Sequence, residues 1–416
     1  LNPYEGIRLV RAARHLVRNV TGYPIRRGLY VDECYDIGRI ENVHFWPFGL
    51  AYHQDEPYCK WINLNGVAFE FARTDWHYVA NTFCFGYGIG YRFSASKHGS
   101  ANGNFLGLGA DSCERAVVVE QAQPPGLLIS NGEFVGRWGS TNAVCLEIMP
   151  GAEGKVSLAN CSFWGPIDRC VWMRSPAGQF SASACHFVHW DNRGIGSPAI
   201  QLDAGRAIVQ GWTFAQDGTA VTVHSNVASA ILIGNQAAGG FRVDNFAGNR
   251  AQIGFNEPDP IAWTPENRMH YKLTVGTAGD QRYLQGFHGP ERGDRPFRWT
   301  AGNARLVLPV APGKPSTVTL ELNVPAHALS DDAGLYLDGQ PLARFSTAQT
   351  VSAFLPSTNA DRVRLELRAR GWVPQRVVAG SKDPRTLGLQ LFSVAIRAEG
   401  AAQAVFDANA GRMVVS

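Results

Sequence analysis

The residues with the clearest chemical potential are acids in the first third of the chain. Asp32, Glu33 and Asp36 lie in one short segment, and Asp75 lies in a similar segment about one repeat later. Carboxyl groups about 5 Å or nearer 10 Å apart are what retaining and inverting glycosidases need, and stacked turns would supply such spacings. Like charges also raise the pKa of one member of such a pair, which provides a general acid. The alternative is a turn whose acids cap backbone N–H groups and pair with arginine.

Two further acids could extend this site. Asp111 follows a glycine-rich run, and Glu133 precedes Phe134 on the outward side of a predicted strand. Both could complete a cleft that crosses coils two to five, with one acid protonating the leaving oxygen and another acting as nucleophile or base. The alternative for each is a solvated turn residue.

Aromatic and basic residues near these acids predict a sugar-binding surface. Trp46 and Trp61 flank the longest insertion between repeats, and Trp76 follows Asp75. Aromatic faces beside a few polar groups suit a binding cleft; the alternative is a loop that covers the coil edge with its own aromatic side chains. The same surface would contain the remaining candidate substrate-binding residues, namely His44, Arg73 and His77.

An internal repeat decides which elements position these residues. A phrase that alternates apolar and variable residues recurs every 20 to 38 residues, at 29–32, 67–70, 91–94, 117–120, 144–147, 171–174, 200–203, 221–224 and 241–244. Alternation with period two marks strands, and several short strands per repeat of this length are typical of a parallel β-helix. A second phrase ends in phenylalanine and predicts two ladders. Phe45, Phe105, Phe134 and Phe163 should stack inside, and Asn42, Asn102, Asn131 and Asn160 should form a turn ladder.

The repeat fades after about residue 255, where the pattern changes. Residues 256–269 read as a linker, and 270–416 contain alternating strands with turn signals. The chain is therefore predicted to be all-β, with a right-handed parallel β-helix over 1–255 and an antiparallel β-sandwich over 270–416.

Composition excludes several classes of function. The formal charge of +3 is too small to indicate a nucleic-acid partner, and no run of 18 apolar residues predicts a membrane span. The eight cysteines form no Cys-x-x-Cys pair, so no zinc motif is predicted, and buried cysteines are as good an expectation as disulfides.

No cofactor is expected, although stacked acids such as Glu120 and Glu147 could hold calcium. The lateral face lacks a continuous apolar stripe, which favours a monomer or small homo-oligomer.

The two ladders over residues 1–255 resemble those of the pectate-lyase-like superfamily of right-handed parallel β-helices, which includes polygalacturonase-related glycosidases and lyases. The resemblance implies a carbohydrate polymer or oligosaccharide as partner. No catalytic residue carries over, because 73–76 and 98–100 match the polygalacturonase motifs only superficially. Such folds usually begin with a capping helix, so we expect an amino-terminal portion to be absent here.

We therefore expect a secreted or periplasmic glycoside hydrolase. The first alternative is a polysaccharide lyase that uses Arg73, His77 or His44, because proton abstraction beside a uronate carboxylate needs a base and a neutralising cation. The second alternative is a non-catalytic glycan-binding or tailspike-like protein.

Overall fold

The computed structural model describes residues 2–47, 56–165, 167–258, 261 and 263–414. It divides into two compact units, one formed by Leu1–Asn192 and Ser197–Pro258 and the other by Arg193–Gly196 and Asp259–Ser416. The main division falls inside the segment predicted to be a linker. None of the described helices is long and apolar enough to cross a membrane.

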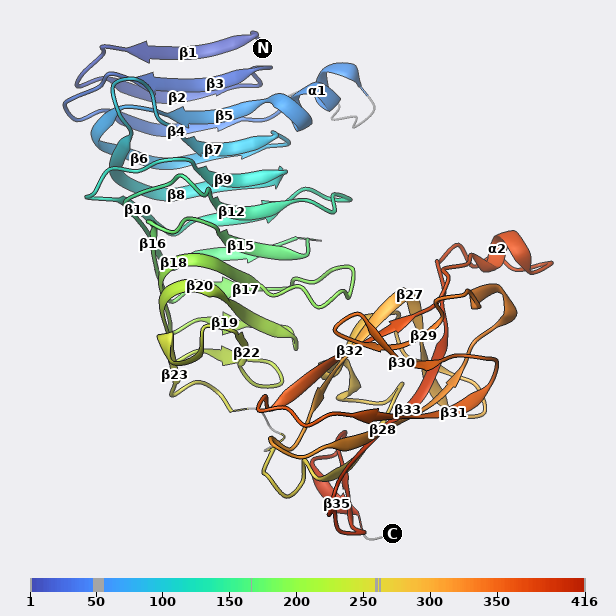
Figure 1. Ribbon diagram of the computed structural model, residues 1–416. Coiled ribbons are helices and arrows are strands. Elements are labelled where there is room, and N and C mark those ends of the chain that lie inside the picture. Colours follow the sequence, from blue (N-terminus) through green and yellow to red (C-terminus); the bar gives the residue numbers. More distant parts are fainter. Residues whose placement is uncertain (1, 48–55, 166, 259–260, 262, 415–416) are drawn as a thin grey trace. The chain divides into compact units, whose positions relative to one another are not determined.

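The first unit is a right-handed parallel β-helix, whose stacked strands run from blue to yellow-green in Figure 1. Within the described residues, ten strands form its first column. They are β1 (Glu5–Val10), β3 (Arg27–Asp32), β5 (Val67–Phe71), β7 (Ile89–Phe93), β9 (Arg115–Val119), β12 (Val144–Ile148), β15 (Arg169–Met173), the starts of β18 (Ile200–Gln210) and β20 (Thr219–Ile233), and β22 (Arg242–Asn245).

Two further columns complete each coil. The second column contains β2 (Leu16–Gly22), β4 (Arg39–Phe45), β6 (Thr74–Phe85), β8 (Ala101–Cys113), β10 (Leu127–Ser130), β13 (Lys155–Ala159), β16 (Gln179–Ser183), the ends of β18 and β20, and β23 (Ala251–Gly254). The third column contains the ends of β2, β4, β6 and β8, followed by β11 (Glu133–Gly136), β14 (Ser162–Trp164), β17 (His186–Phe187), β19 (Thr213–Phe214) and β21 (Gln236–Ala237). Helix α1 (Pro57–Asn65) precedes β5, and a short 3₁₀ helix, η1 (Gly248–Arg250), precedes β23.

A single left-handed residue turns the chain from the second column to the third. Asn42, Asn131 and Asn160 have φ of 51°, 55° and 52°, a region that asparagine tolerates better than most residues. Their amides also bond between coils, as in the 2.8 Å contact from Asn160 Nδ2 to Asn131 Oδ1. The predicted turn ladder is confirmed at these three positions. It is wrong at Asn102, because Gly107 (φ 64°) makes this turn in the fourth coil.

The buried aromatic ladder follows directly after that corner. Phe134 pairs with Phe163 in register, and Phe163 with Phe187, whose ring centroid lies 4.8 Å away. Phe105 is not part of this ladder, since it lies in the second column between Val79 and Ile129. Its phrase matches the others in sequence, but the later turn at Gly107 shifts the register, so that Ala110 occupies the ladder position.

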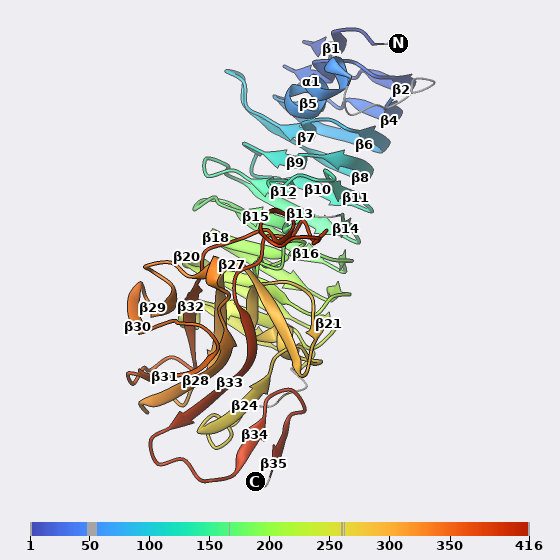
Figure 2. The ribbon, with the colours of Figure 1, turned by 90° about the vertical axis from the view of Figure 1, so that its right-hand side faces the viewer.

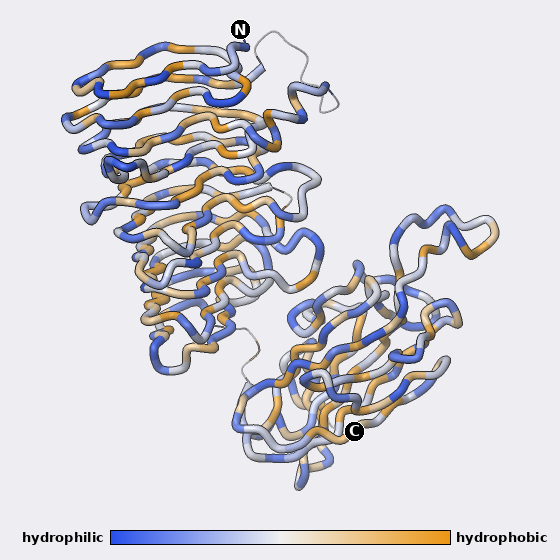
Figure 3. The backbone as a smooth tube through the Cα atoms, turned by 45° about the horizontal axis from the view of Figure 1, so that its top comes forward, coloured by the Kyte–Doolittle hydropathy of each residue, from blue (hydrophilic) through white to orange (hydrophobic). Residues whose placement is uncertain are grey.

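The cysteines lie inside the solenoid. All eight are buried and none forms a disulfide. Cys161 and Cys185 lie in successive coils, and the Cys161 backbone N–H donates to Cys185 Sγ at 3.5 Å. These thiols therefore behave as small core residues. Figure 3 shows apolar and polar residues interspersed along the coils.

The second unit is a β-sandwich with mainly antiparallel pairing, labelled in Figure 2. Its strands are β24 (His270–Thr274), β25 (Leu284–Phe287), β26 (Glu291–Arg292), β27 (Pro296–Pro309), β28 (Ser316–Asn323), β29 (Gly334–Leu337), β30 (Gln340–Arg344), β31 (Gln349–Leu355), β32 (Arg362–Arg368), β33 (Gln390–Ala398), β34 (Val405–Asp407) and β35 (Arg412–Val414). Helix α2 (Pro374–Val377) and two 3₁₀ turns, η2 (Asp280–Arg282) and η3 (Ala326–Ala328), connect them. Among the described strands of this unit, only β24 and β34 pair in parallel. The unit has its own apolar core, as an independent domain needs.

Candidate functional site

A hollow of about 470 Å³ opens at the corner between the first and second columns, and we call it the turn groove. It crosses the second to fifth coils. Its lining residues are Tyr35, Arg73, Asp75, Trp76, Asn102, Gly103, Asn104, Gln123, Pro125, Gly126 and Leu128.

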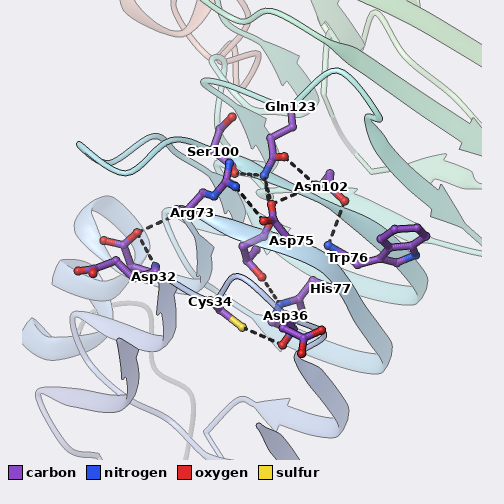
Figure 4. Close-up of polar contacts among 12 residues, drawn as sticks. Asp32, Cys34, Asp36, Arg73, Asp75, Trp76, His77, Ser100, Asn102 and Gln123 are labelled. Carbon is purple, nitrogen blue, oxygen red and sulfur yellow. Dashed lines mark hydrogen bonds and ion pairs between the residues drawn. The ribbon is translucent and has the colours of Figure 1, made fainter. Parts of the chain in front are cut away.

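Asp75 lies at the centre of a polar network in this groove (Figure 4). Arg73 Nη2 lies 2.8 Å from one carboxylate oxygen, and Gln123 Nε2 donates to the other at 2.7 Å. Asn102 Nδ2 donates to Gln123 Oε1 at 2.8 Å and lies 3.4 Å from Asp75 Oδ1. Because the partners come from three coils, stacking fixes the orientation of these planar polar groups before any ligand arrives.

Trp76 supplies an aromatic face beside this network. Its side chain is 64% exposed, and its backbone takes the left-handed conformation with φ of 55°. The Trp76 N–H donates to Asn102 Oδ1 at 3.0 Å, which holds the turn. Across the groove, the Arg73 guanidinium lies over the exposed Tyr35 ring, 5.3 Å from its centroid. The indole is therefore presented to solvent from an anchored backbone.

Two glycines that line the groove are required by the close stacking of neighbouring coils. A Cβ atom at Gly103 would lie 2.2 Å from the His77 carbonyl oxygen, and one at Gly126 would lie 2.7 Å from the Lys155 carbonyl oxygen. Both positions also have positive φ, so larger residues would be strained as well as crowded.

The acids at residues 32–36 are engaged by local partners. Asp32 accepts hydrogen bonds from Ser96 Oγ at 2.8 Å and from the backbone N–H groups of Glu33 and Arg73. Burial raises the pKa of Asp32, but these hydrogen bonds outweigh it and the net pKa is lowered. This is the turn-capping arrangement, and it does not suit a general acid.

Glu33 and Asp36 are paired with arginines of the preceding coil. Arg11 Nε lies 2.7 Å from Glu33, and Arg14 Nε lies 2.5 Å from Asp36. Neither acid lines the turn groove, in which Asp75 is the single acid among the described lining residues.

His77 is expected from the sequence to contact the substrate, but the structure places it in the interior. Its side chain is fully buried inside the corner, where burial, followed by repulsion from His15, lowers its pKa to about 3. A sugar in the groove cannot reach this ring. The polarity of the residue suggested a surface role, but its neighbours in the stack place it in the interior.

Asp111 and Glu133 lie on the outer face of the third column, away from the turn groove. Asp111 is half-buried, and burial raises its pKa despite a hydrogen bond from the backbone of Ser112. Glu133 is exposed and pairs in register with Gly109, two residues before Asp111. Strand geometry then separates the Asp111 and Glu133 Cα atoms by about 8 Å.

Aromatic residues of the second and third coils share that outer face. His44 stacks on Trp46 at 5.8 Å between centroids, and burial lowers the His44 pKa. Trp46 lies 6.3 Å from Phe85, which pairs in register with Asp111. We call Trp46, Phe85, Asp111 and Glu133 the flank cluster.

The residues of the single cleft predicted from sequence are thus divided between the turn groove and the flank cluster. Trp61 belongs to neither part, since it lies on α1 beside Tyr4 with centroids 6.2 Å apart. Residues 48–55 of the predicted insertion lie outside the described residues. The three lyase candidates are also separated, with Arg73 in the turn groove, His77 inside the corner and His44 on the third column.

Sequence reasoning missed Asn102 and Gln123 as members of the groove. Their only signal is that each occupies the same corner as Asp75, one and two coils later. The calcium candidates Glu120 and Glu147 have cationic neighbours instead, with Arg92 2.8 Å from Glu120 and Arg174 2.8 Å from Glu147. A charge-compensated ladder accounts for them.

A comparison with solved structures aligns the chain with two phage tailspike proteins. The tailspike of Acinetobacter baumannii phage AM24 aligns over 96% of this chain and 78% of its own at 9% identity, with a TM-score of 0.33. The enzymatically active domain of bacteriophage CBA120 tailspike protein 4 aligns over 95% of this chain and 64% of its own at 9% identity, with a TM-score of 0.24. No family model matches the chain, and no curated protein matches its sequence. The function of the chain must therefore be argued from its own geometry.

Proposed function

We propose that this protein binds a polysaccharide or oligosaccharide in the turn groove. The observation that carries the proposal is the exposed Trp76 face beside the fixed polar set of Arg73, Asp75, Asn102 and Gln123. An aromatic ring packs on the apolar face of a sugar, while planar amide, carboxylate and guanidinium groups pair with its hydroxyls.

The length of the groove favours a carbohydrate chain over a single sugar. Its lining residues come from four successive coils, from Tyr35 to Leu128. Three coil spacings correspond to about 15 Å, so an extended ligand would meet equivalent positions as it crosses each coil.

Binding is tested by titrating the full chain with a panel of acidic and neutral polysaccharides, using calorimetry or glycan arrays. Trp76→Ala should weaken binding about 10-fold through lost stacking, and Asp75→Asn should weaken it through a disturbed network. The matched control is Trp138→Ala, because Trp138 is 52% exposed but lies outside the groove. Equal affinities for Trp76→Ala and the parent protein would contradict the proposal.

A second candidate function, glycoside hydrolysis, is favoured by the flank cluster. Burial raises the Asp111 pKa, as a general acid requires, and Glu133 is an exposed carboxylate on the next coil of the same outer face. Asp111 would give its proton to the leaving oxygen as the glycosidic bond breaks. Glu133 would take a proton from the attacking water, whose oxygen bonds to the anomeric carbon.

Release of reducing ends from a bound polysaccharide tests this activity. Asp111→Asn and Glu133→Gln should each reduce the rate by about 100-fold or more, whereas Glu41→Gln serves as a control at an exposed ion pair. Ultraviolet absorbance from an unsaturated product would point to a lyase instead. Parent-like rates in both variants would exclude this pair.

A further inference from the structure

Three metal-ligating side chains from successive coils meet inside the corner that carries the turn groove. His15 precedes β2, Cys34 follows β3, and His77 lies within β6. One ligand atom from each lies within 4.8 Å of the other two. A whole coil or more of chain separates His77 from the others, so no short motif could reveal the cluster.

Each histidine uses Nδ1 for a hydrogen bond, and Nδ1 of His15 also lies 3.7 Å from Cys34 Sγ. His15 Nδ1 lies 2.6 Å from the Ala12 carbonyl oxygen, which can only accept, so Nδ1 carries the proton. His77 Nδ1 lies 2.6 Å from Thr74 Oγ1. A ligating histidine typically uses its second nitrogen for such a contact, which fixes the ring and its tautomer.

The remaining nitrogen of each ring has no hydrogen bond. Nε2 of His15 and Nε2 of His77 are both buried without a partner among the described residues. His77 is 0% exposed, and leaving a polar atom unsatisfied at such a position is costly. An unpaired nitrogen on each of two adjacent rings, with centroids 5.0 Å apart, calls for a common explanation.

Gly38 preserves the space between the rings. A Cβ atom there would lie 2.5 Å from His15 Nε2 and 2.5 Å from His77 Cε1. Any other residue would therefore intrude on the position where the two rings converge.

We propose that His15, Cys34 and His77 form a binding site for a divalent transition-metal ion, with Zn²⁺ as the preferred ion. Two imidazoles and one thiolate are a donor set that zinc accepts, and three protein ligands leave one tetrahedral position for water. Binding requires the thiolate, so the Cys34 proton passes to solvent as the metal–sulfur bond forms. The ion would join three coils below the turn groove.

Metal binding is measured on the full chain after treatment with a chelator. Addition of Co²⁺ should produce a thiolate-to-cobalt charge-transfer band that saturates at one equivalent, and Zn²⁺ should displace the cobalt. Zinc should also raise the Tm, because it binds the folded chain.

Matched variants locate the site. Cys34→Ser should abolish the charge-transfer band and weaken zinc binding at least about 10-fold. Cys161→Ser, at another buried thiol in a later coil, should retain both. His15→Asn, at a half-buried ring, gives a second ligand variant if Cys34→Ser does not fold, as judged by circular dichroism.

Three results would overturn the proposal. The first is that the parent chain takes up no more Co²⁺ than Cys34→Ser, and the second is that the band survives in folded Cys34→Ser and His15→Asn. Loss of the band in Cys161→Ser alone would likewise assign the metal to a different thiol and reject this site.

Discussion

The interiors of the early and late coils differ in chemistry although they share one backbone plan. From the fifth coil onward, Phe134, Phe163, Phe187 and Phe214 stack in the third column. In the third and fourth coils the interior includes polar side chains with specific partners, such as Thr74 with His77 and Thr82 with Tyr91. The third column of the late coils is thus stabilised by apolar stacking, whereas the third and fourth coils hold these specific buried hydrogen bonds in their interior.

The largest expected effect comes from breaking the late ladder. Phe163 is fully buried between Phe134 and Phe187, so Phe163→Ala removes contacts on both sides and leaves a cavity. The free energy of unfolding of the solenoid should fall by about 3–5 kcal/mol, measured by denaturant titration. Val188→Ala, at an exposed position nearby, should change it by less than about 0.5 kcal/mol. A loss below about 1 kcal/mol for Phe163→Ala would show that the ladder does not dominate.

The polar interior of the early coils is tested by Thr74→Val. This change keeps the shape of the side chain but leaves His77 Nδ1 without its 2.6 Å partner. We expect a loss of about 1–3 kcal/mol, since the ring cannot reach water. Thr213→Val is the matched control, because Thr213 makes the same 2.6 Å contact with His186 at an exposed site. Equal losses in the two variants would mean that burial does not set the cost.

A smaller effect is expected at the corner that both halves share. Asn160→Ala removes the amide contact with Asn131 and places a Cβ residue less suited to φ of 52°. It should cost about 1 kcal/mol, whereas Asn160→Gly should cost less, since glycine adopts this conformation freely. A greater loss for glycine than for alanine would show that backbone strain is unimportant there.

The smallest effect concerns Asp111 and depends on pH. Because burial raises its pKa, folding favours the protonated carboxyl. The contribution to stability is therefore greatest below the ordinary pKa of aspartate and is lost as pH rises through the raised value. Asp111→Asn should be more stable than the parent at pH 7 and should lose this advantage under acidic conditions. Thermal unfolding across pH, with Glu133→Gln as an exposed control, checks this sign.

The sequence was sufficient for the architecture but not for the register of every coil. Strand periodicity and the phrases that end in phenylalanine indicate a β-helix. Phe105 and Phe134 both end a phrase of the form Asn-Gly-x-Phe, yet they lie in different columns. The difference arises because Gly107 makes the left-handed turn of the fourth coil, where other coils use an asparagine that can be recognised in the sequence. For the same reason, the sequence predicts a single cleft for Asp75 and Glu133. The side of the β-helix on which an acid lies depends on its column, and the sequence does not specify the column. Buried His77 was equally hidden, because its partners come from other coils.

The corner between the second and third columns also limits how such a chain can change during evolution. In the first nine coils it is crossed by one left-handed residue, whether Asn, Gly or, at residue 184, Ala. The connection from the third column back to the first varies instead from a single residue before β9 to the long excursion that contains α1. Insertions and deletions should therefore accumulate on the return connection, because a change of loop length there does not shift the register of the stacked strands. At the fixed corner, a change of one residue would exchange the inward and outward faces of all that follows in that coil.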